Sequence, residues 1–132
     1  MKLFTVEEAE ALIPELEKLF DAVAELAAQA HAKSQKAEAL ARSEPGAAAE
    51  LALARAQVQF LTGQIEAKLQ SIIDLGAVPK GLDPALVDFP ARLEGSEVFL
   101  CWKLGEKKIT HFHGVDDGFA GRRQLPPRRR PS

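Results

Sequence analysis

The sequence has few of the residues that stabilise small proteins covalently or through metals. A single cysteine in 132 residues excludes a disulfide within the chain and a zinc site built from four cysteines. There is no tyrosine, and there is one tryptophan. No apolar run approaches the ~20 residues that a membrane-spanning helix needs. The first residues include acids where a signal peptide would have its apolar stretch. We therefore expect a cytoplasmic protein with no membrane partner.

Charge is unevenly distributed along the chain, with the end of the chain strongly basic. The net charge is −2, although residues 120–132 contain five arginines and no acid. The rest of the chain is therefore distinctly acidic, which does not attract nucleic acid by bulk charge. We expect residues 126–132 to be a flexible, basic and Pro-rich tail. Its three consecutive arginines can contact phosphates, so nucleic-acid binding stays open only as a third hypothesis.

Two helices are expected at the start of the chain. Thr5 and Glu8 have the spacing of a capping box, and apolar residues follow at alternating intervals of four and three. Pro14 lacks an amide hydrogen and tolerates only the first turn of a helix. We expect a short helix that ends at about Ile13 and a long helix from there to about Arg42. A single kinked helix is the alternative.

A second long helix is expected after a tight turn. Pro45 and Gly46 break the first long helix, and the helical pattern resumes over about 47–75, with Gly76 as the C-terminal cap. Because the link is so short, the two long helices must be antiparallel neighbours. This predicts a coiled-coil-like helical hairpin over about 5–75.

The second long helix has two apolar stripes, roughly 160° apart at the helical repeat. A simple hairpin needs only one apolar face. The extra stripe consists of Ala49, Leu53, Ala56, Phe60, Gly63 and Ala67. We expect it to pack against a second copy of the chain, giving a homodimer. The alternative is that the C-terminal third covers it.

The sequence of the C-terminal third predicts β-structure. Residues 76–95 suggest an ordered connection with a short strand around 86–89. Residues 97–103 and 108–113 are β-branched and aromatic, and a two-residue type II′ turn at Gly105 and Glu106 would join them as a small β-hairpin. The fold class is therefore α+β: a helical hairpin followed by a small β-hairpin and ordered loops, in one domain over residues 1–125.

The proposed turn also fixes which side chains share a face. It pairs Trp102 with Ile109, Leu100 with His111, Val98 with His113, Phe99 with Phe112 and Cys101 with Thr110. His111 and His113 then lie on the face of Trp102, and Cys101 lies on the other face. A thiol nucleophile needs a histidine within reach, so this register favours a structural thiol.

Several motifs resemble one known family. They are FTVEEAEALIPEL (4–16), LVDFPA (86–91), VFLCWKLGE (98–106), HFH (111–113) and DDGFAGRR (116–123). The chain resembles, over nearly its whole length, the uncharacterised prokaryotic family catalogued as domain of unknown function 2203. It departs from the family pattern at Ala85, where glycine is usual, and at Phe112, where tryptophan is usual. The resemblance implies a bacterial or archaeal protein of this architecture and no known activity.

The rare chemical groups of the C-terminal third supply the candidate site residues. The metal candidates are His111, His113, Asp116 and Asp117, with Asp88 and Glu97 as further ligands. Such a set suits a divalent transition metal such as Zn²⁺, Mn²⁺ or Fe²⁺. An ordinary turn flanked by edge-strand histidines would explain the same residues.

The ligand-binding candidates are Asp88, Trp102, Glu106 and Arg122. Residues 118–122 can cradle an anion through backbone amides and Arg122. Alternatively, Arg122 pairs with Asp88 or Glu106 and locks this loop onto the hairpin.

Two main functional hypotheses follow. The first is a non-enzymatic module that self-associates through its helices and binds a protein partner or small ligand around residues 88–122. The second is a metal-dependent, hydrolase-like enzyme that uses His111, His113 and Asp116 or Asp117. The sequence names no substrate.

Overall fold

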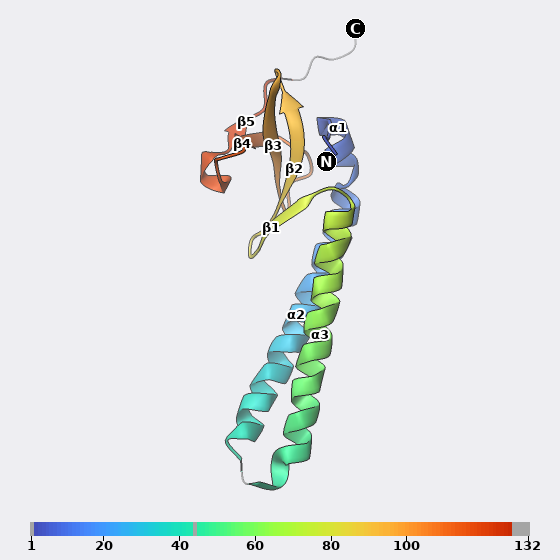
Figure 1. Ribbon diagram of the computed structural model, residues 1–132, viewed down its shortest axis with the longest axis vertical. Coiled ribbons are helices and arrows are strands. Elements are labelled where there is room, and N and C mark those ends of the chain that lie inside the picture. Colours follow the sequence, from blue (N-terminus) through green and yellow to red (C-terminus); the bar gives the residue numbers. More distant parts are fainter. Residues whose placement is uncertain (1, 44, 128–132) are drawn as a thin grey trace. The chain divides into compact units, whose positions relative to one another are not determined.

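The computed structural model describes residues 2–43 and 45–127, which form two compact units (Figure 1). One unit combines the chain up to Glu17 with the chain from Ile72 onward, and the other is Lys18–Ser71. The consecutive arginines at 128–130 lie outside the described residues, so the flexible tail stays a prediction. The single domain over 1–125 likewise stays a prediction. None of the described helices is long and apolar enough to cross a membrane.

The first two helices begin and end where the sequence predicts. Helix α1 spans Val6–Ala11, and helix α2 spans Ile13–Ala41, so the two-helix prediction is confirmed. The Thr5 hydroxyl accepts from the Glu8 amide, and the Glu8 carboxylate accepts from the Thr5 amide, which completes the capping box. Pro14 occupies the first turn of α2, where its missing amide hydrogen costs nothing.

Helix α3 follows a one-turn 3-10 helix at Pro45–Ala47 and spans Ala48–Asp74. Gly76 ends it with a φ of 96°, a conformation that favours glycine. A Cβ at Gly76 would also lie 3.2 Å from the Phe4 ring. Glycine is therefore required twice at this position, by the backbone and by the packing of Phe4.

The helical unit buries one apolar stripe of α3 and leaves the other exposed. Ala54 and Leu61 of α3 are buried, as are Leu19, Phe20 and Val23 of α2. On the other stripe, Leu53 is 60% exposed and Phe60 is 66% exposed. Within the helical unit, the described residues therefore leave the second stripe uncovered.

The β-structure is larger than the sequence predicts. The described residues form a five-stranded antiparallel sheet in the order β1-β2-β3-β4-β5. The strands are β1 (Val78–Leu82), β2 (Ala85–Leu93), β3 (Ser96–Lys103), β4 (His111–Gly114) and β5 (Arg123–Gln124).

The prediction of a small β-hairpin with loops is therefore wrong. Prolines and glycines at 76–95 suggested a connection, because proline cannot donate to a sheet ladder. Pro79 lies in the edge strand β1 beside an irregularity in the register, where that loss is tolerated. Pro90 lies in β2, and its carbonyl oxygen accepts from the Phe4 amide at 2.7 Å.

The predicted register between β3 and β4 is wrong by one residue. The observed pairs are Val98 with Gly114, Phe99 with His113, Leu100 with Phe112 and Cys101 with His111. Because successive side chains of a strand alternate between faces, a shift of one residue moves every side chain of β4 to the other face. His111 and His113 therefore share a face with Cys101.

The connection between β3 and β4 explains the shift. The Glu106 carboxylate accepts from the Lys103 amide at 2.7 Å, and the Trp102 indole N–H donates to the Glu106 carbonyl at 2.9 Å. The Ile109 amide donates to the Glu10 carboxylate of α1 at 2.8 Å, and Ile109 is buried. Ile109 thus contacts α1, residues 108–110 lie outside the ladder, and pairing with β3 includes β4 only from His111 onward.

The sheet has two faces with different content. On the core face, Val87 and Phe89 of β2 pair with Trp102 and Leu100 of β3, and all four are buried. Phe4 packs edge-on against Phe89, with ring centres 5.2 Å apart. The opposite face, called the site face below, carries Asp88, Cys101 and His113.

We expect Phe89→Ala to lower the free energy of unfolding by about 3–5 kcal/mol, because Phe89 is fully buried on the core face. Leu82→Ala is the matched control, since Leu82 lies in the same sheet and is 52% exposed; it should cost less than about 1 kcal/mol. Urea unfolding measures both. Equal effects of the two changes would contradict the assignment of the core face.

Candidate functional site

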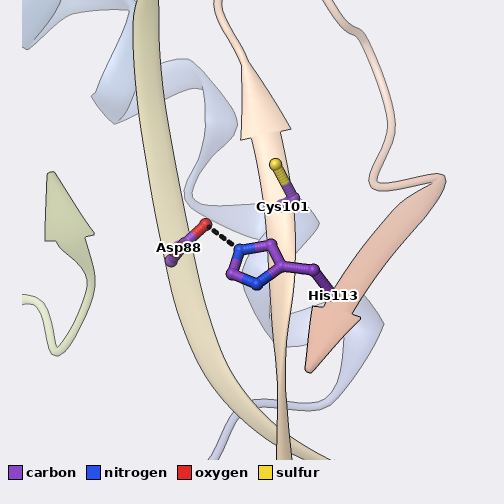
Figure 2. A group of neighbouring side chains, drawn as sticks. All are labelled: Asp88, Cys101 and His113. Carbon is purple, nitrogen blue, oxygen red and sulfur yellow. Dashed lines mark ion pairs between the residues drawn. The ribbon is translucent and has the colours of Figure 1, made fainter. Parts of the chain in front are cut away.

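Three buried side chains with different donor atoms meet on the site face. Asp88, Cys101 and His113 offer one ligand atom each, and these atoms all lie within 4.8 Å of one another. The three side chains come from neighbouring strands β2, β3 and β4 (Figure 2). Their residues are only 4%, 1% and 3% exposed, respectively. They are called the Asp88–Cys101–His113 group below.

The strand register brings the group together. Asp88 pairs directly with Cys101, so their side chains leave the same face. His113 pairs with Phe99, two residues before Cys101, and reaches Asp88 diagonally over β3. The Phe99 and His113 rings lie 5.5 Å apart between centres, tilted by 40°, which restricts the imidazole to this position.

Both imidazole nitrogens of His113 have partners. Nδ1 lies 2.9 Å from the Gly114 carbonyl oxygen, which can only accept, so Nδ1 carries a proton. Nε2 lies 3.0 Å from Oδ1 of Asp88. A carboxylate also only accepts, so this second contact needs a proton or a cation at Nε2.

The Cys101 thiol is protonated at neutral pH. The pKa of Cys101 is raised to about 11 overall: burial is the main cause, the Arg122 guanidinium lowers the pKa, and nearby Asp88 and Glu106 raise it. A thiol is a poor nucleophile, so the prediction of an unreactive buried thiol agrees with this pKa. The predicted register placed Cys101 on the face away from the histidines, and this reason for an unreactive thiol is wrong, because Cys101 lies on the same face as His111 and His113.

The site face has a cavity of about 270 Å³. It is lined by Lys80, Leu86, Asp88, Phe99, Cys101, His113, Val115, Asp117, Gly118 and Phe119. The group forms its polar part, and leucine, valine and phenylalanine side chains form its apolar part. The mixture is typical of small-molecule sites, which are mostly apolar with a few placed polar groups.

The loop after β4 forms one wall of the cavity, and Asp117 holds it. Its carboxylate accepts from the Gly114 amide at 3.2 Å. A Cβ at Gly114 would lie 2.9 Å from the Asp117 carboxylate, and a Cβ at Gly121 would lie 3.0 Å from the Asp117 Cβ. Both positions therefore suit glycine because Asp117 fills the space between them.

Arg122 fastens the same loop to the turn after β3. Its Nη2 lies 3.0 Å from both oxygens of the Glu106 carboxylate, so one of the two expected pairings is present. Its guanidinium lies 4.7 Å from the centre of the Phe119 ring. The amides of Gly121 and Arg122 donate to carbonyls of the same loop, so those two amides do not cradle an anion.

The metal candidates do not all meet. His113 joins Asp88, while Nδ1 of His111 lies 2.8 Å from the Thr110 hydroxyl. Within the described residues, the group that could hold a metal is Asp88, Cys101 and His113. The other candidates do not belong to it: His111, Asp116, Asp117 and Glu97. Asp116 and Glu97 are exposed.

Among the ligand-binding candidates, Asp88 lines the cavity, whereas Trp102 is buried on the core face and Glu106 pairs with Arg122. Sequence reasoning missed Cys101 as a member of the group because of the wrong register. It also missed Lys80 in the cavity wall. One signal was present: Asp88 is a lone acid inside the apolar run LVDFPA, and a buried carboxylate requires a partner.

We expect a double-mutant cycle of Arg122→Gln and Glu106→Gln to give a coupling energy of about 1–3 kcal/mol, because a hydrogen bond to a charged group in a part-buried pair is stronger than a surface ion pair. Urea unfolding of the four proteins measures it. The Lys107–Glu17 pair, with its lysine side chain 81% exposed, is the matched control and should couple by less than about 1 kcal/mol. Coupling no larger than in the control would show that Arg122 does not hold the loop.

Comparison with known proteins identifies the family of the chain. The family model described as "Uncharacterized conserved protein (DUF2203)" matches residues 2–125. No curated protein and no solved structure shows significant similarity to the chain. The matched range includes both long helices, the whole sheet and the Asp88–Cys101–His113 group. The chain therefore belongs to the DUF2203 family of uncharacterized conserved proteins.

Proposed function

We propose that this chain is a non-enzymatic binding module that holds a small ligand in the cavity of the site face and self-associates through α3. The observation that carries the first part is the cavity of about 270 Å³ with a buried polar group at one side. An apolar cavity of about 150 Å³ already accommodates benzene. The space here therefore suits a molecule of one to two rings.

The charges around the cavity favour a small organic anion. The Asp88 carboxylate faces His113, and the Asp117 carboxylate accepts from a backbone amide, so both acids are engaged. Lys80 is exposed at the cavity, with Nζ 5.8 Å from the centre of the Phe99 ring. A carboxylate can reach this ammonium group while its apolar part contacts Phe99, Phe119 and Val115.

We expect benzoate to bind saturably and benzylamine to bind far less, as measured by ligand-observed NMR. Lys80→Gln should lower the affinity for benzoate several-fold, because it removes the cation. Gly118→Leu should weaken the binding of benzoate strongly, since Gly118 lines the cavity and a Cβ there has open space around it, so a larger side chain can compete with the ligand without displacing the fold.

Ala120→Leu is the matched control, because Ala120 lies in the same loop but does not line the cavity; it should bind like the unchanged chain. Equal binding of benzoate and benzylamine would contradict the proposed ligand class. Binding that Gly118→Leu leaves unchanged would place the ligand elsewhere.

The exposed stripe of α3 supports self-association. Leu53 and Phe60 lie two turns apart on one side of the helix and are both exposed. The stripe from Ala49 to Ala67 is about 27 Å long by the helical rise. Pairing two helical hairpins into a coiled-coil-like four-helix bundle would bury it, and symmetric homodimers are the commonest assemblies of soluble proteins.

We expect the unchanged chain to be a dimer at micromolar concentration and Phe60→Glu to be a folded monomer, because the new charge would be buried in the contact. Light scattering measures the mass, and circular dichroism checks the fold. Gln59→Glu adds the same charge at the next, exposed position off the stripe and should remain dimeric. A monomeric unchanged chain would contradict the assembly.

The alternative of a metal-dependent hydrolase needs His111 and Asp116 or Asp117 to coordinate with His113. Within the described residues, His113 meets Asp88 and Cys101 instead. The binding module therefore has the better support.

A further inference from the structure

The Asp88–Cys101–His113 group combines three properties of a metal site. Its three residues are buried, they offer one oxygen, one sulfur and one nitrogen ligand, and these atoms converge within 4.8 Å. They are held by three neighbouring strands rather than by loops, so their positions are fixed by the ladder (Figure 2). Sites built on rigid elements hold ligand geometry better than sites on loops.

The hydrogen bond at Nδ1 of His113 is the second observation. Metal-binding histidines almost always donate the other ring N–H to a carbonyl or carboxylate, which fixes the tautomer and the ring orientation. His113 makes this bond to the Gly114 carbonyl at 2.9 Å and directs Nε2 to Asp88 at 3.0 Å. Nε2, the nitrogen that would bind a metal, thus faces Asp88.

We propose that Asp88, Cys101 and His113 form a three-ligand Zn²⁺ site, with Cys101 as the thiolate ligand. Thiolate and imidazole donors select borderline-soft metals, whereas Mg²⁺ and Ca²⁺ prefer oxygen ligands alone. The site differs from the set that the sequence suggests, because it takes Cys101 in place of His111 and takes Asp88 in place of Asp116 or Asp117.

The spacing of the group fits this ion after a small adjustment. Zinc bonds of about 2.0–2.3 Å in tetrahedral geometry place ligand atoms roughly 3.3–3.7 Å apart. The Nε2 and Oδ1 atoms, 3.0 Å apart, would separate slightly to admit the ion between them, and the sulfur would approach. Side-chain rotation of Asp88 and Cys101 supplies movements of this size without altering the ladder.

Binding of Zn²⁺ releases the thiol proton of Cys101. The thiol of Cys101 loses its proton to solvent as the sulfur–zinc bond forms, and a coordinated thiol remains deprotonated. His113 keeps the proton on Nδ1 and binds through Nε2. Any proton held between Nε2 and Asp88 also leaves when the ion replaces it.

The site would have an open position. Three protein ligands leave the fourth corner of a zinc tetrahedron free, as in catalytic zinc sites. All three ligands line the cavity, so water or the carboxylate of a bound ligand can take that corner. The zinc site does not depend on the proposed ligand, because metal binding is measured without any added organic anion.

Metal binding is tested on untagged full-length protein that has been dialysed against a chelator. Titration with Zn²⁺ in competition with a chromophoric chelator should show one ion per chain. Titration with Co²⁺ should give a near-ultraviolet thiolate-to-cobalt charge-transfer band, which reports the Cys101–metal bond itself. Zn²⁺ should also raise the melting temperature, because it binds only the folded arrangement.

Single substitutions in the group should separate ligands from neighbours. Cys101→Ala should abolish the charge-transfer band. Cys101→Ala and His113→Gln should each lower the Zn²⁺ affinity by more than about 100-fold, since loss of a residue that only hydrogen-bonds a ligand already lowers metal affinity by about 10–100-fold. His111→Gln and Asp116→Asn are the matched controls, since neither residue lines the cavity, and both variants should bind Zn²⁺ with the affinity of the unchanged chain.

The proposal is overturned if the unchanged protein binds no Zn²⁺ at a hundred-micromolar concentration and its melting temperature does not respond. It is also overturned if Cys101→Ala, folded by circular dichroism, binds Zn²⁺ as before. In either case the Asp88–His113 contact is a buried ion pair only. Loss of binding in His111→Gln would instead restore the histidine pair as the ligands.

Discussion

The pairing of β4 with β3 is the constraint on which the site depends. A strand alternates its side chains between two faces, so its register decides which residues can meet. The Glu10 carboxylate of α1 accepts from the Ile109 amide, and residues 108–110 lie outside the β3–β4 ladder. Strand β4 therefore begins at His111, opposite Cys101. This register, next to a hydrogen bond that the Ile109 amide donates to helix α1, places His113 beside Asp88, on the face away from Trp102.

A second contact connects the two faces of the sheet. Glu106 receives the Lys103 amide and both of its carboxylate oxygens contact Arg122, while its carbonyl accepts the Trp102 indole N–H. Glu106 therefore holds both the buried Trp102 of the core face and, through Arg122, the loop that forms one wall of the cavity. Hydrogen bonds to charged groups contribute about 1.5–3 kcal/mol each, enough to order so short a loop.

The burial of Asp88 and His113 suggests a role other than stability. Removing two polar groups from water is costly, and their mutual attraction often does no better than a pair of well-packed apolar side chains. Strand β2 is otherwise buried along most of its length, so an apolar residue at 88 would suit the burial of this position equally well. The polar pair instead faces a cavity beside a thiol, which is the chemistry of a binding site.

The sequence alone determined the helices, because caps, breakers and apolar spacing act within a few residues. The capping box of Thr5, the position of Pro14 and the cap at Gly76 all appear as predicted. The α+β class followed from the same local signals. The extent of the sheet, the register of β4 and the membership of the group were decided by the tertiary structure. These features depend on contacts such as Glu10 with Ile109, 99 residues apart, which no local pattern encodes.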